Sequence, residues 1–204
     1  AGINASQNGD IILVYPGIYH ENIIIDNKNI TVASLYYTTN DPAYISNTII
    51  DGGHQSNCVL VQNNVTLASL IGLTLVNGKG TFTTHVDVDT GGGVLIKSDC
   101  TFNISHCIIT NNYAECGGGI CVFNNSVLNL SSTSIRDNFV NDEAGGLMIM
   151  GSNVNFDPVN LNSIYNNYGD GADIMIYWSE QTPIYLDTLS VLLDHPDNFF
   201  VKET

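Results

Sequence analysis

The stretches CIITNNYAECGGGICVF (Cys107–Phe123) and SIRDNFVNDEAGGLMIM (Ser134–Met150) follow one pattern. Each runs through apolar residues, an Asn-rich turn, an acidic residue, a glycine cluster and a second apolar run. The two copies lie 26 to 27 residues apart. Self-similarity with a period of about 20 to 50 residues indicates a repeat architecture, in which stacked units bury a common core.

Aligning the residue that follows each glycine cluster predicts columns of equivalent apolar side chains. Val94, Ile120 and Leu147 are spaced 26 and 27 residues apart, and the pattern extends to Val59 and Ile174. Two further columns follow from the same alignment, namely Leu67, Ile104, Leu130 and Phe156, and Leu75, Ile109, Ile135 and Ile164.

Each repeat therefore holds three short runs of alternating apolar residues, and nothing between them is long enough for a crossover helix. The alternation is clear in TFNIS, where Phe102 and Ile104 share one face and Asn103 takes the other. We expect an all-β fold, a right-handed, single-stranded parallel β-helix with three short strands per coil of about 26 residues.

Two sets of turn residues support this fold. Asn77, Asn111, Asp137 and Asn166 occupy one aligned turn, and Asn tolerates left-handed backbone better than most residues. The clusters Gly91–Gly93, Gly117–Gly119 and Gly145–Gly146 mark another turn, which we expect to need unusual dihedral angles. Both sets are interpreted as structural.

The length fits one domain with a sizeable core, so we expect a single β-helix domain over residues 1–204. Residues 1–9 are interpreted as the remnant of an N-terminal capping helix, and residues 10–57 as the first wide coils. Regular repeats are expected over residues 58–176. Residues 177–204 lack the Asn and Gly signatures and are interpreted as a closing segment that protects the last strands.

The chain is strongly acidic, with 20 Asp and Glu against 5 Lys and Arg and a formal net charge of −15. Such a field repels phosphate backbones and anionic membrane surfaces, so nucleic acid is not an expected partner. No stretch is long and apolar enough to predict a membrane span. The charge is compatible with calcium and with an extracellular location.

Five cysteines are present, and none forms the C-x-x-C pair that is typical of zinc sites. We interpret most of them as small buried apolar residues. A bridge between Cys116 and Cys121, or between Cys100 and Cys121, is the alternative.

The opening NGDIILVYPGIYHENIII (residues 8–25) resembles the first coil of pectin-lyase-like β-helix proteins. Gly118-Gly119-Ile120 and Gly145-Gly146-Leu147 are similar to the GG-apolar motif of polymorphic outer-membrane protein repeats. The stretches Ile109–Asn112, Ile135–Asn138 and Ile164–Asn167 are similar to the F-x-x-N motif of those repeats, with Ile in place of the aromatic residue. The resemblance implies a secreted bacterial surface protein, and this architecture hosts lyases, hydrolases, adhesins and spacers.

A β-helix polysaccharide lyase would use Arg or Lys as base and calcium to stabilise the developing charge. Arg136 is the candidate base. It lies between the inward-facing Ile135 and the turn residue Asp137, so its side chain is expected to point outward from the coil. The alternative is a solvent-facing side chain paired with Asp137. Its expected column neighbours are Val76, Thr110 and Tyr165, and none of them is basic.

A calcium site is predicted at one turn. Asp89, Glu115 and Asp142 each lie four residues before the last glycine of their cluster, so stacked coils would align their carboxylates. Carboxylate oxygens at that spacing repel one another unless a cation or solvent intervenes, and calcium prefers such ligands. A solvated acidic rim is the alternative.

The turn that precedes Gly91 is enlarged to twelve residues, KGTFTTHVDVDT (Lys79–Thr90). Insertions on one face of a solenoid often mark the binding face. Phe82, His85 and Asp87 are therefore the predicted ligand-contacting residues. An insertion without a role is the alternative.

These observations favour a non-catalytic, secreted or cell-surface β-helix that acts as a stalk, an adhesin or a carbohydrate-contacting module. A calcium-dependent uronate lyase that uses Arg136 is the first alternative. Self-association into an extracellular assembly through an exposed coil end is the second. The expected partners are a polysaccharide, a cell-surface molecule or a second copy of the chain.

Overall fold

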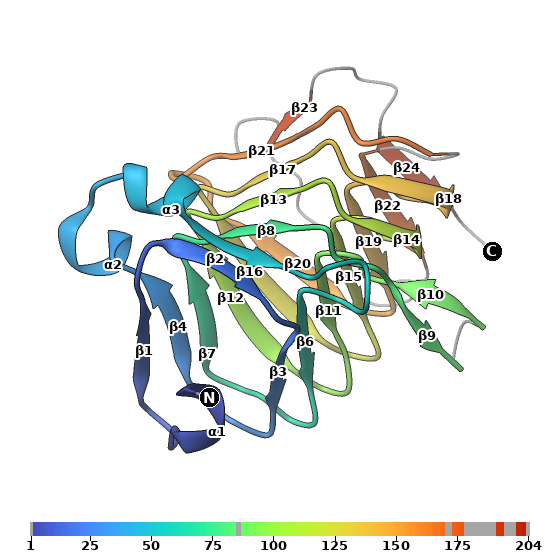
Figure 1. Ribbon diagram of the computed structural model, residues 1–204. Helices are drawn as coiled ribbons and strands as arrows, with labels where there is room; N and C mark the ends of the chain where they lie inside the picture. The colour runs from blue at the N-terminus through green and yellow to red at the C-terminus, as the bar shows by residue number, and fades with distance from the viewer. Residues whose placement is uncertain (1, 85–86, 170–172, 178–190, 194–198, 203–204) are drawn as a thin grey trace.

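The polypeptide winds into stacked coils that contribute strands to three parallel sheets (Figure 1). The structure is a computed structural model, and it describes residues 2–84, 87–169, 173–177, 191–193 and 199–202. All strand pairs within these three sheets are parallel in the described part of the chain. The predicted all-β parallel β-helix is therefore confirmed.

Each of the three sheets takes its strands from successive coils. Sheet 1 has six strands: β1 (Ile11–Val14), β4 (Thr31–Ser34), β7 (Ala68–Ile71), β12 (Thr101–Ser105), β16 (Val127–Ser131) and β20 (Asn153–Phe156). Sheet 2 has seven: β2 (Gly17–His20), β5 (Thr48–Asp51), β8 (Thr74–Val76), β13 (Ile108–Thr110), β17 (Ser134–Arg136), β21 (Asn162–Tyr165) and β23 (Val191–Leu193). Sheet 3 also has seven: β3 (Ile23–Asp26), β6 (Val59–Gln62), β11 (Val94–Ile96), β15 (Ile120–Phe123), β19 (Leu147–Met150), β22 (Ile174–Tyr177) and β24 (Phe199–Lys202).

The first predicted column is confirmed over its whole length. Val94 pairs in register with Val59 and with Ile120. Ile120 then pairs with Leu147, and Leu147 with Ile174. The third column is confirmed as well, through the register of β8, β13, β17 and β21.

The second column contains one error. Ile104 pairs with Leu130 and Leu130 with Phe156, but the partner of Ile104 on the other side is Leu70, not Leu67. Leu67 lies in the turn before β7 and is 74% exposed. Its backbone N–H donates to Asn29 Oδ1 at 2.8 Å. The two leucines are three positions apart, so strand alternation allows only one of them to face the core.

The predicted Asn-rich turn is confirmed as left-handed in every copy, with φ between 54° and 55°. Its residues bind one another along the stack, since the N–H of Asn111 donates to the carbonyl of Asp137 at 3.0 Å. The glycine turn also behaves as predicted. Gly117 has a φ of +65°, and a Cβ added there would lie 2.7 Å from the carbonyl oxygen of Ile120.

Apolar side chains from the three sheets form a continuous core along the axis of the coils. Phe102, Leu70 and Ile109 are among its fully buried members. All five cysteines are buried free thiols. The expectation of small buried apolar residues is therefore confirmed, and the alternative disulfides with Cys121 are wrong.

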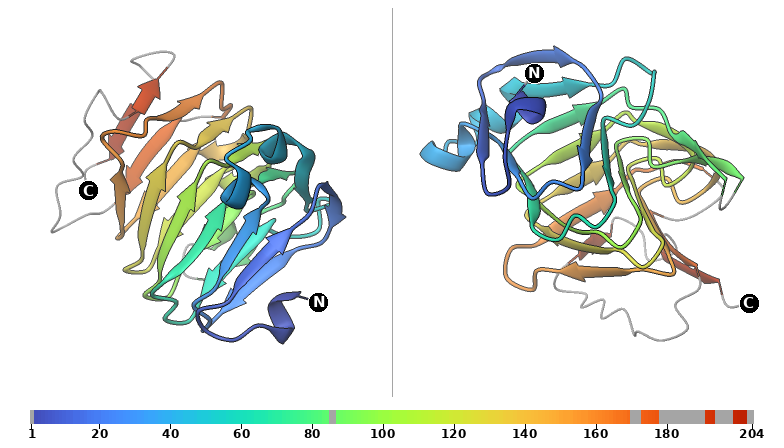
Figure 2. Two further views of the ribbon diagram at one scale, coloured as in Figure 1. Left: turned by 90° about the vertical axis from the view of Figure 1, so that its left-hand side faces the viewer. Right: turned by 90° about the horizontal axis from the view of Figure 1, so that it is seen from below.

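The N-terminal end differs from the repeats (Figure 2). The helical remnant predicted over residues 1–9 is present as one short helix, α1 (Gly2–Ala5), beside the first coil. An insertion after β4 forms α2 (Tyr36–Thr39) and α3 (Ala43–Asn47). The closing segment predicted over residues 177–204 lies mostly outside the described residues, apart from β23 and β24, which continue sheets 2 and 3.

A pocket of about 520 Å³ opens at the first coil and is lined by residues such as Ile3, Ile12 and Tyr19. Among the described helices, none combines the length and the apolar character that crossing a membrane would require.

Candidate ligand-binding face

A fourth sheet, which the sequence did not predict, lies on one side of the coils (Figure 1, right). We call it the side sheet. The strands β10, β14 and β18 pair in parallel and belong to successive coils, whereas β9 pairs antiparallel with β10 and comes from the predicted insertion. Its four strands are β9 (Thr81–Thr83), β10 (Val88–Thr90), β14 (Tyr113–Cys116) and β18 (Phe139–Glu143).

The two faces of the side sheet have opposite character because side chains alternate along each strand. On β14, Ala114 and Cys116 are buried, while Tyr113 and Glu115 are partly exposed. The buried face covers the outer surface of sheet 3. The other face carries the partly exposed and exposed side chains, and we call it the open face.

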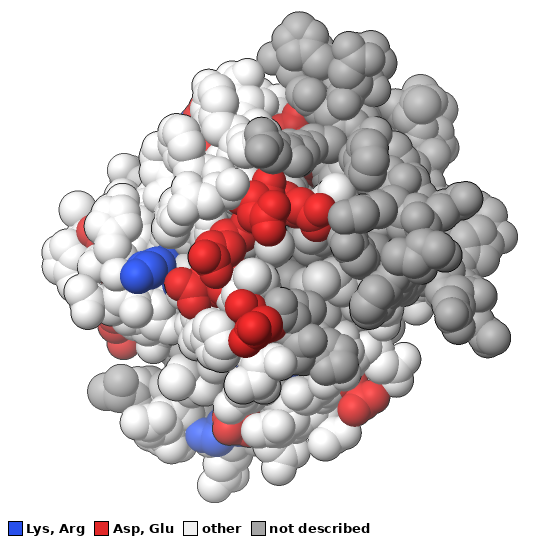
Figure 3. Space-filling model, turned by 90° about the vertical axis from the view of Figure 1, so that its right-hand side faces the viewer, with Lys and Arg blue, Asp and Glu red and all other residues white. Residues whose placement is uncertain are grey.

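Acidic side chains form a row on this open face (Figure 3). The pairing of Thr90 with Cys116 places Asp89 opposite Glu115, and the backbone N–H of Asp89 donates to Glu115 Oε2 at 2.8 Å. The predicted alignment of these two carboxylates is therefore present.

Asp142, the third residue of the predicted calcium site, lies in a β-bulge. Ala114 pairs with Val140 and Cys116 with Glu143, so Asn141 and Asp142 of β18 together oppose Glu115 of β14. Within the described residues, no three side chains of His, Cys, Asp or Glu are grouped closely enough to hold a metal ion. Calcium binding at this edge stays a prediction.

Aromatic side chains form a second row on the open face. Tyr113 pairs in register with Phe139, and Phe139 pairs with Tyr168. The rings of Phe139 and Tyr168 stack with centroids 5.0 Å apart and an interplanar angle of 18°. These two side chains are 48% and 51% exposed, so the stacked pair forms an aromatic patch on the surface.

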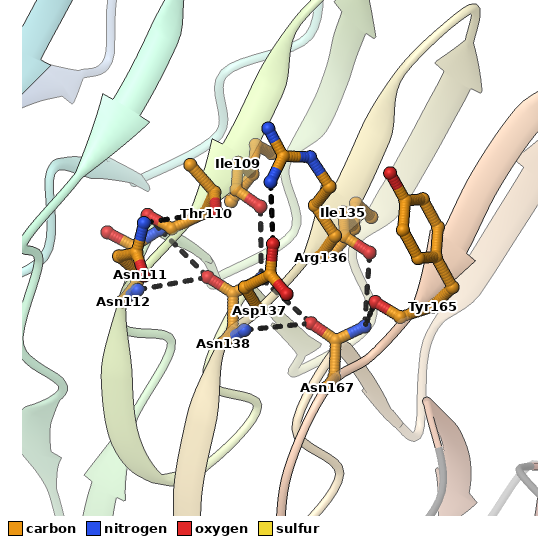
Figure 4. A network of polar contacts seen from close by, with 10 residues as sticks. All are labelled: Ile109, Thr110, Asn111, Asn112, Ile135, Arg136, Asp137, Asn138, Tyr165 and Asn167. Atoms are coloured by element: carbon orange, nitrogen blue, oxygen red, sulfur yellow. Dashed lines mark hydrogen bonds and ion pairs between the residues drawn. The ribbon is translucent and has the colours of Figure 1, made fainter.

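A buried asparagine ladder fixes the backbone immediately before each of these aromatic residues (Figure 4). Asn112 Nδ2 donates to Asn138 Oδ1 at 3.0 Å, and Asn138 Nδ2 donates to Asn167 Oδ1 at 2.9 Å. Over the described residues the ladder reaches Asp173, whose Oδ1 accepts from Asn167 Nδ2 at 2.8 Å. These asparagines are the final residues of the I-x-x-N motifs, so the motif sets the register of the aromatic row.

The insertion adds an aromatic group to the same face. Phe82 pairs with Asp89 across the antiparallel β9–β10 ladder, and opposed residues of such a pair project to one side. Phe82 is 55% exposed. Asp87 is exposed at the tip of the hairpin with a φ of 60°, and His85 lies outside the described residues.

Arg136 lies on sheet 2, not on the side sheet (Figure 4). Its Nη1 forms an ion pair with Asp137 Oδ2 at 2.6 Å, which is the pairing that the sequence suggested as an alternative. Its register neighbours are Thr110 and Tyr165. The guanidinium of Arg136 is therefore paired with the adjacent Asp137, and neither of its two register neighbours is basic.

Sequence reasoning missed one polar cluster near the N-terminus. His20 Nδ1 lies 3.3 Å from Asp51 Oδ2, and Asn77 Nδ2 donates to Asp51 Oδ1 at 3.0 Å. Burial opposes the ionisation of Asp51, but the hydrogen bonds from the Gly53 N–H and Asn77, together with the nearby histidines, lower its pKa overall. The irregular spacing of the first coil hid this pair, since His20 and Asp51 are 31 residues apart.

The cysteines are poorly suited to nucleophilic catalysis, because the reactive form is the thiolate. Burial raises the pKa of Cys58 and of Cys107 to about 12 and that of Cys116 to about 11. Burial also raises the pKa of Cys121. All four thiols are therefore protonated at neutral pH.

No protein-family model, curated protein or solved structure matches the chain.

Proposed function

We propose that the protein is a non-catalytic β-helix of the pectin-lyase-like kind, displayed outside the cell, that binds a neutral polysaccharide on the side sheet. The observation that carries the proposal is the open face of this sheet. There a row of carboxylates runs beside a row of exposed aromatic side chains over three successive coils.

The chemistry of this face suits sugar rings. Carboxylates accept strong hydrogen bonds from hydroxyl groups, and aromatic side chains pack against the apolar C–H faces of a sugar. The rings of Phe139 and Tyr168 stack on each other and together form an exposed aromatic surface beside the carboxylates. Phe82 stands on the neighbouring hairpin and is the residue that we expect to stack on a sugar.

The negative charge of this face favours a neutral polysaccharide over an anionic one. Asp89 and Glu115 on the face, and a net charge of −15 for the chain, would repel a polyuronate. The ion pair of Arg136 with Asp137 also supports a binding role over the lyase alternative. Calcium at Asp89 and Glu115 remains part of the proposal, as an ion that would bridge carboxylates and sugar hydroxyls.

The test is binding to a panel of neutral polysaccharides and to polygalacturonate, measured by affinity electrophoresis with and without calcium. We expect retardation by a neutral polymer and a loss of at least about tenfold in affinity for Phe82→Ala and for Glu115→Gln, since each removes one direct contact. Tyr37→Ala is the matched control, because Tyr37 is an exposed aromatic residue on α2.

Two outcomes would contradict the proposal. One is that neither Phe82→Ala nor Glu115→Gln weakens binding more than Tyr37→Ala does. The other is that polygalacturonate binds and is converted to an unsaturated product that absorbs in the ultraviolet. Equal binding with calcium and with chelator would remove calcium from the proposal and leave the sugar face in place.

Self-association is the second candidate, and the first coil favours it. The strands β1, β2 and β3 are edge strands of their sheets, and their coil exposes apolar side chains such as Ile11, Ile18 and Ile24. Exposed edges with apolar side chains are typical sites of pairing with another chain.

A further inference from the structure

The buried face of the side sheet encloses a second, smaller core that is rich in sulfur. It lies between the side sheet and the outer surface of sheet 3, separate from the main core. All three methionines of the chain belong to this region, with Met148 and Met175 buried and Met150 packed against it. Two of the five thiols, Cys116 and Cys121, are also buried there.

Register brings these side chains together. Cys121 of β15 pairs with Met148 of β19, and Met148 pairs with Met175 of β22. Adjacent strands lie about 4.8 Å apart, so the three sulfur side chains form a column on one face of sheet 3.

Cys116 approaches this column from the opposite sheet. The next residue, Gly117, lies so close that a Cβ added to it would meet Cys121 Cβ at 2.9 Å and Met148 Cβ at 3.1 Å. The backbone that carries Cys116 is therefore in contact with the column.

We propose that four sulfur side chains of this cluster bind one soft monovalent metal ion, with Cu(I) as the reference ion: Cys116, Cys121, Met148 and Met175. Thiolate and thioether sulfur select Cu(I) among the biological metals, whereas zinc favours thiolate, imidazole and carboxylate ligands.

The charge balance suits the apolar surroundings. On binding, one thiol, which we assign to Cys116, releases its proton to solvent, and its thiolate sulfur forms a bond to the ion. Copper stays in the +1 state, so thiolate and ion together are neutral, and a neutral pair is far less costly to bury than an isolated charge. The remaining thiol and the two thioethers act as neutral ligands.

The same sheet offers a route for the ion. Glu115 precedes Cys116 and faces outward, and Glu143 pairs with Cys116 in register on β18. This negative surface raises the local concentration of cations next to the least buried of the four sulfur residues.

The test is an anaerobic titration of the protein with Cu(I) in competition with a chromogenic Cu(I) chelator. We expect one bound ion per chain. Met148→Leu and Cys116→Ser should each weaken binding by at least about tenfold, since losing even an outer partner of a metal ligand costs about 10- to 100-fold. Cys107→Ser is the control, a buried thiol of the main core that should keep wild-type affinity.

Absence of binding would overturn the proposal, as would equal affinities of Met148→Leu, Cys116→Ser and Cys107→Ser. X-ray absorption at the copper edge of the wild-type protein gives a measurement that does not depend on whether a variant folds. Sulfur as the only first neighbour is expected, and nitrogen or oxygen ligands would refute the site.

Discussion

The buried amides of the asparagine ladder are the residues on which the coil geometry depends most directly. Asn138 accepts from the backbone N–H and from Nδ2 of Asn112, and it donates to Asn167 Oδ1 and to the Ile109 carbonyl. Leaving such buried groups without partners costs far more than the net contribution of an average hydrogen bond.

We expect Asn138→Ala to lower the free energy of unfolding by about 3 kcal/mol, because several buried polar atoms lose their partner at once. Asn129→Ala is the matched control. It interrupts a similar ladder on the outer face of sheet 1, between Asn103 and Asn155, where water can replace the amide. Urea unfolding of both variants checks this prediction, and equal losses of stability would contradict it.

The lowered pKa of Asp51 predicts that the free energy of unfolding decreases at acidic pH. Burial alone would raise the pKa of this carboxyl in the folded state, but the hydrogen bonds and the nearby histidines outweigh burial and lower the pKa, so the folded state favours the ionised form. The resulting stabilisation is present above the unfolded-state pKa and is lost as the pH falls through the folded-state pKa.

We therefore expect the wild-type protein to lose more unfolding free energy between neutral and strongly acidic pH than Asp51→Asn does. Asparagine keeps an oxygen that can accept from Gly53 and Asn77, which limits the direct damage of the substitution. Denaturant titrations across the acidic range measure the difference, and parallel curves for the two proteins would refute it.

At the scale of elements, the sequence pattern was sufficient for the strands that face the main core. Two of the three predicted columns hold in full, because inward positions follow a strict alternation and a fixed period. The second column failed at Leu67, where the turn before β7 shifted the parity of an apolar run.

The strands of the side sheet could not be predicted from the sequence pattern in the same way. Its strands follow the buried Asn of each coil, and their short runs mix aromatic, acidic and small residues with only partial alternation. The alignment of Asp89 with Glu115 was predictable from spacing, whereas the bulge that sets both Asn141 and Asp142 against Glu115 depends on one extra residue in its coil. The aromatic row was missed because Tyr113, Phe139 and Tyr168 become one surface only when the coils stack.

At the scale of the whole molecule, the first coil is the feature without a counterpart in the repeats. Later coils place polar residues such as Asn103 and Asn129 on the outer face of sheet 1, where β1 exposes Ile11 and Leu13. The pocket at the same end, lined by both apolar and polar side chains, adds to the surface that a second copy would cover.

We expect sedimentation velocity to show concentration-dependent association that Ile18→Lys weakens, because Ile18 is 61% exposed on the edge strand β2 and a buried unpaired charge is costly. Val159→Lys is the control, an exposed apolar residue outside the first coil. A protein that sediments as a monomer at every concentration would exclude self-association through this end.

The hydrogen bonds of the asparagine ladder all run in the same direction along the stack of coils. Within the described residues, each amide oxygen of the ladder accepts from the preceding coil and each amide nitrogen donates to the following one, as far as the carboxylate of Asp173. A coil that carries its own asparagine in this orientation is thus an interchangeable module. It can be duplicated or removed during evolution without altering the hydrogen bonds that its neighbours offer.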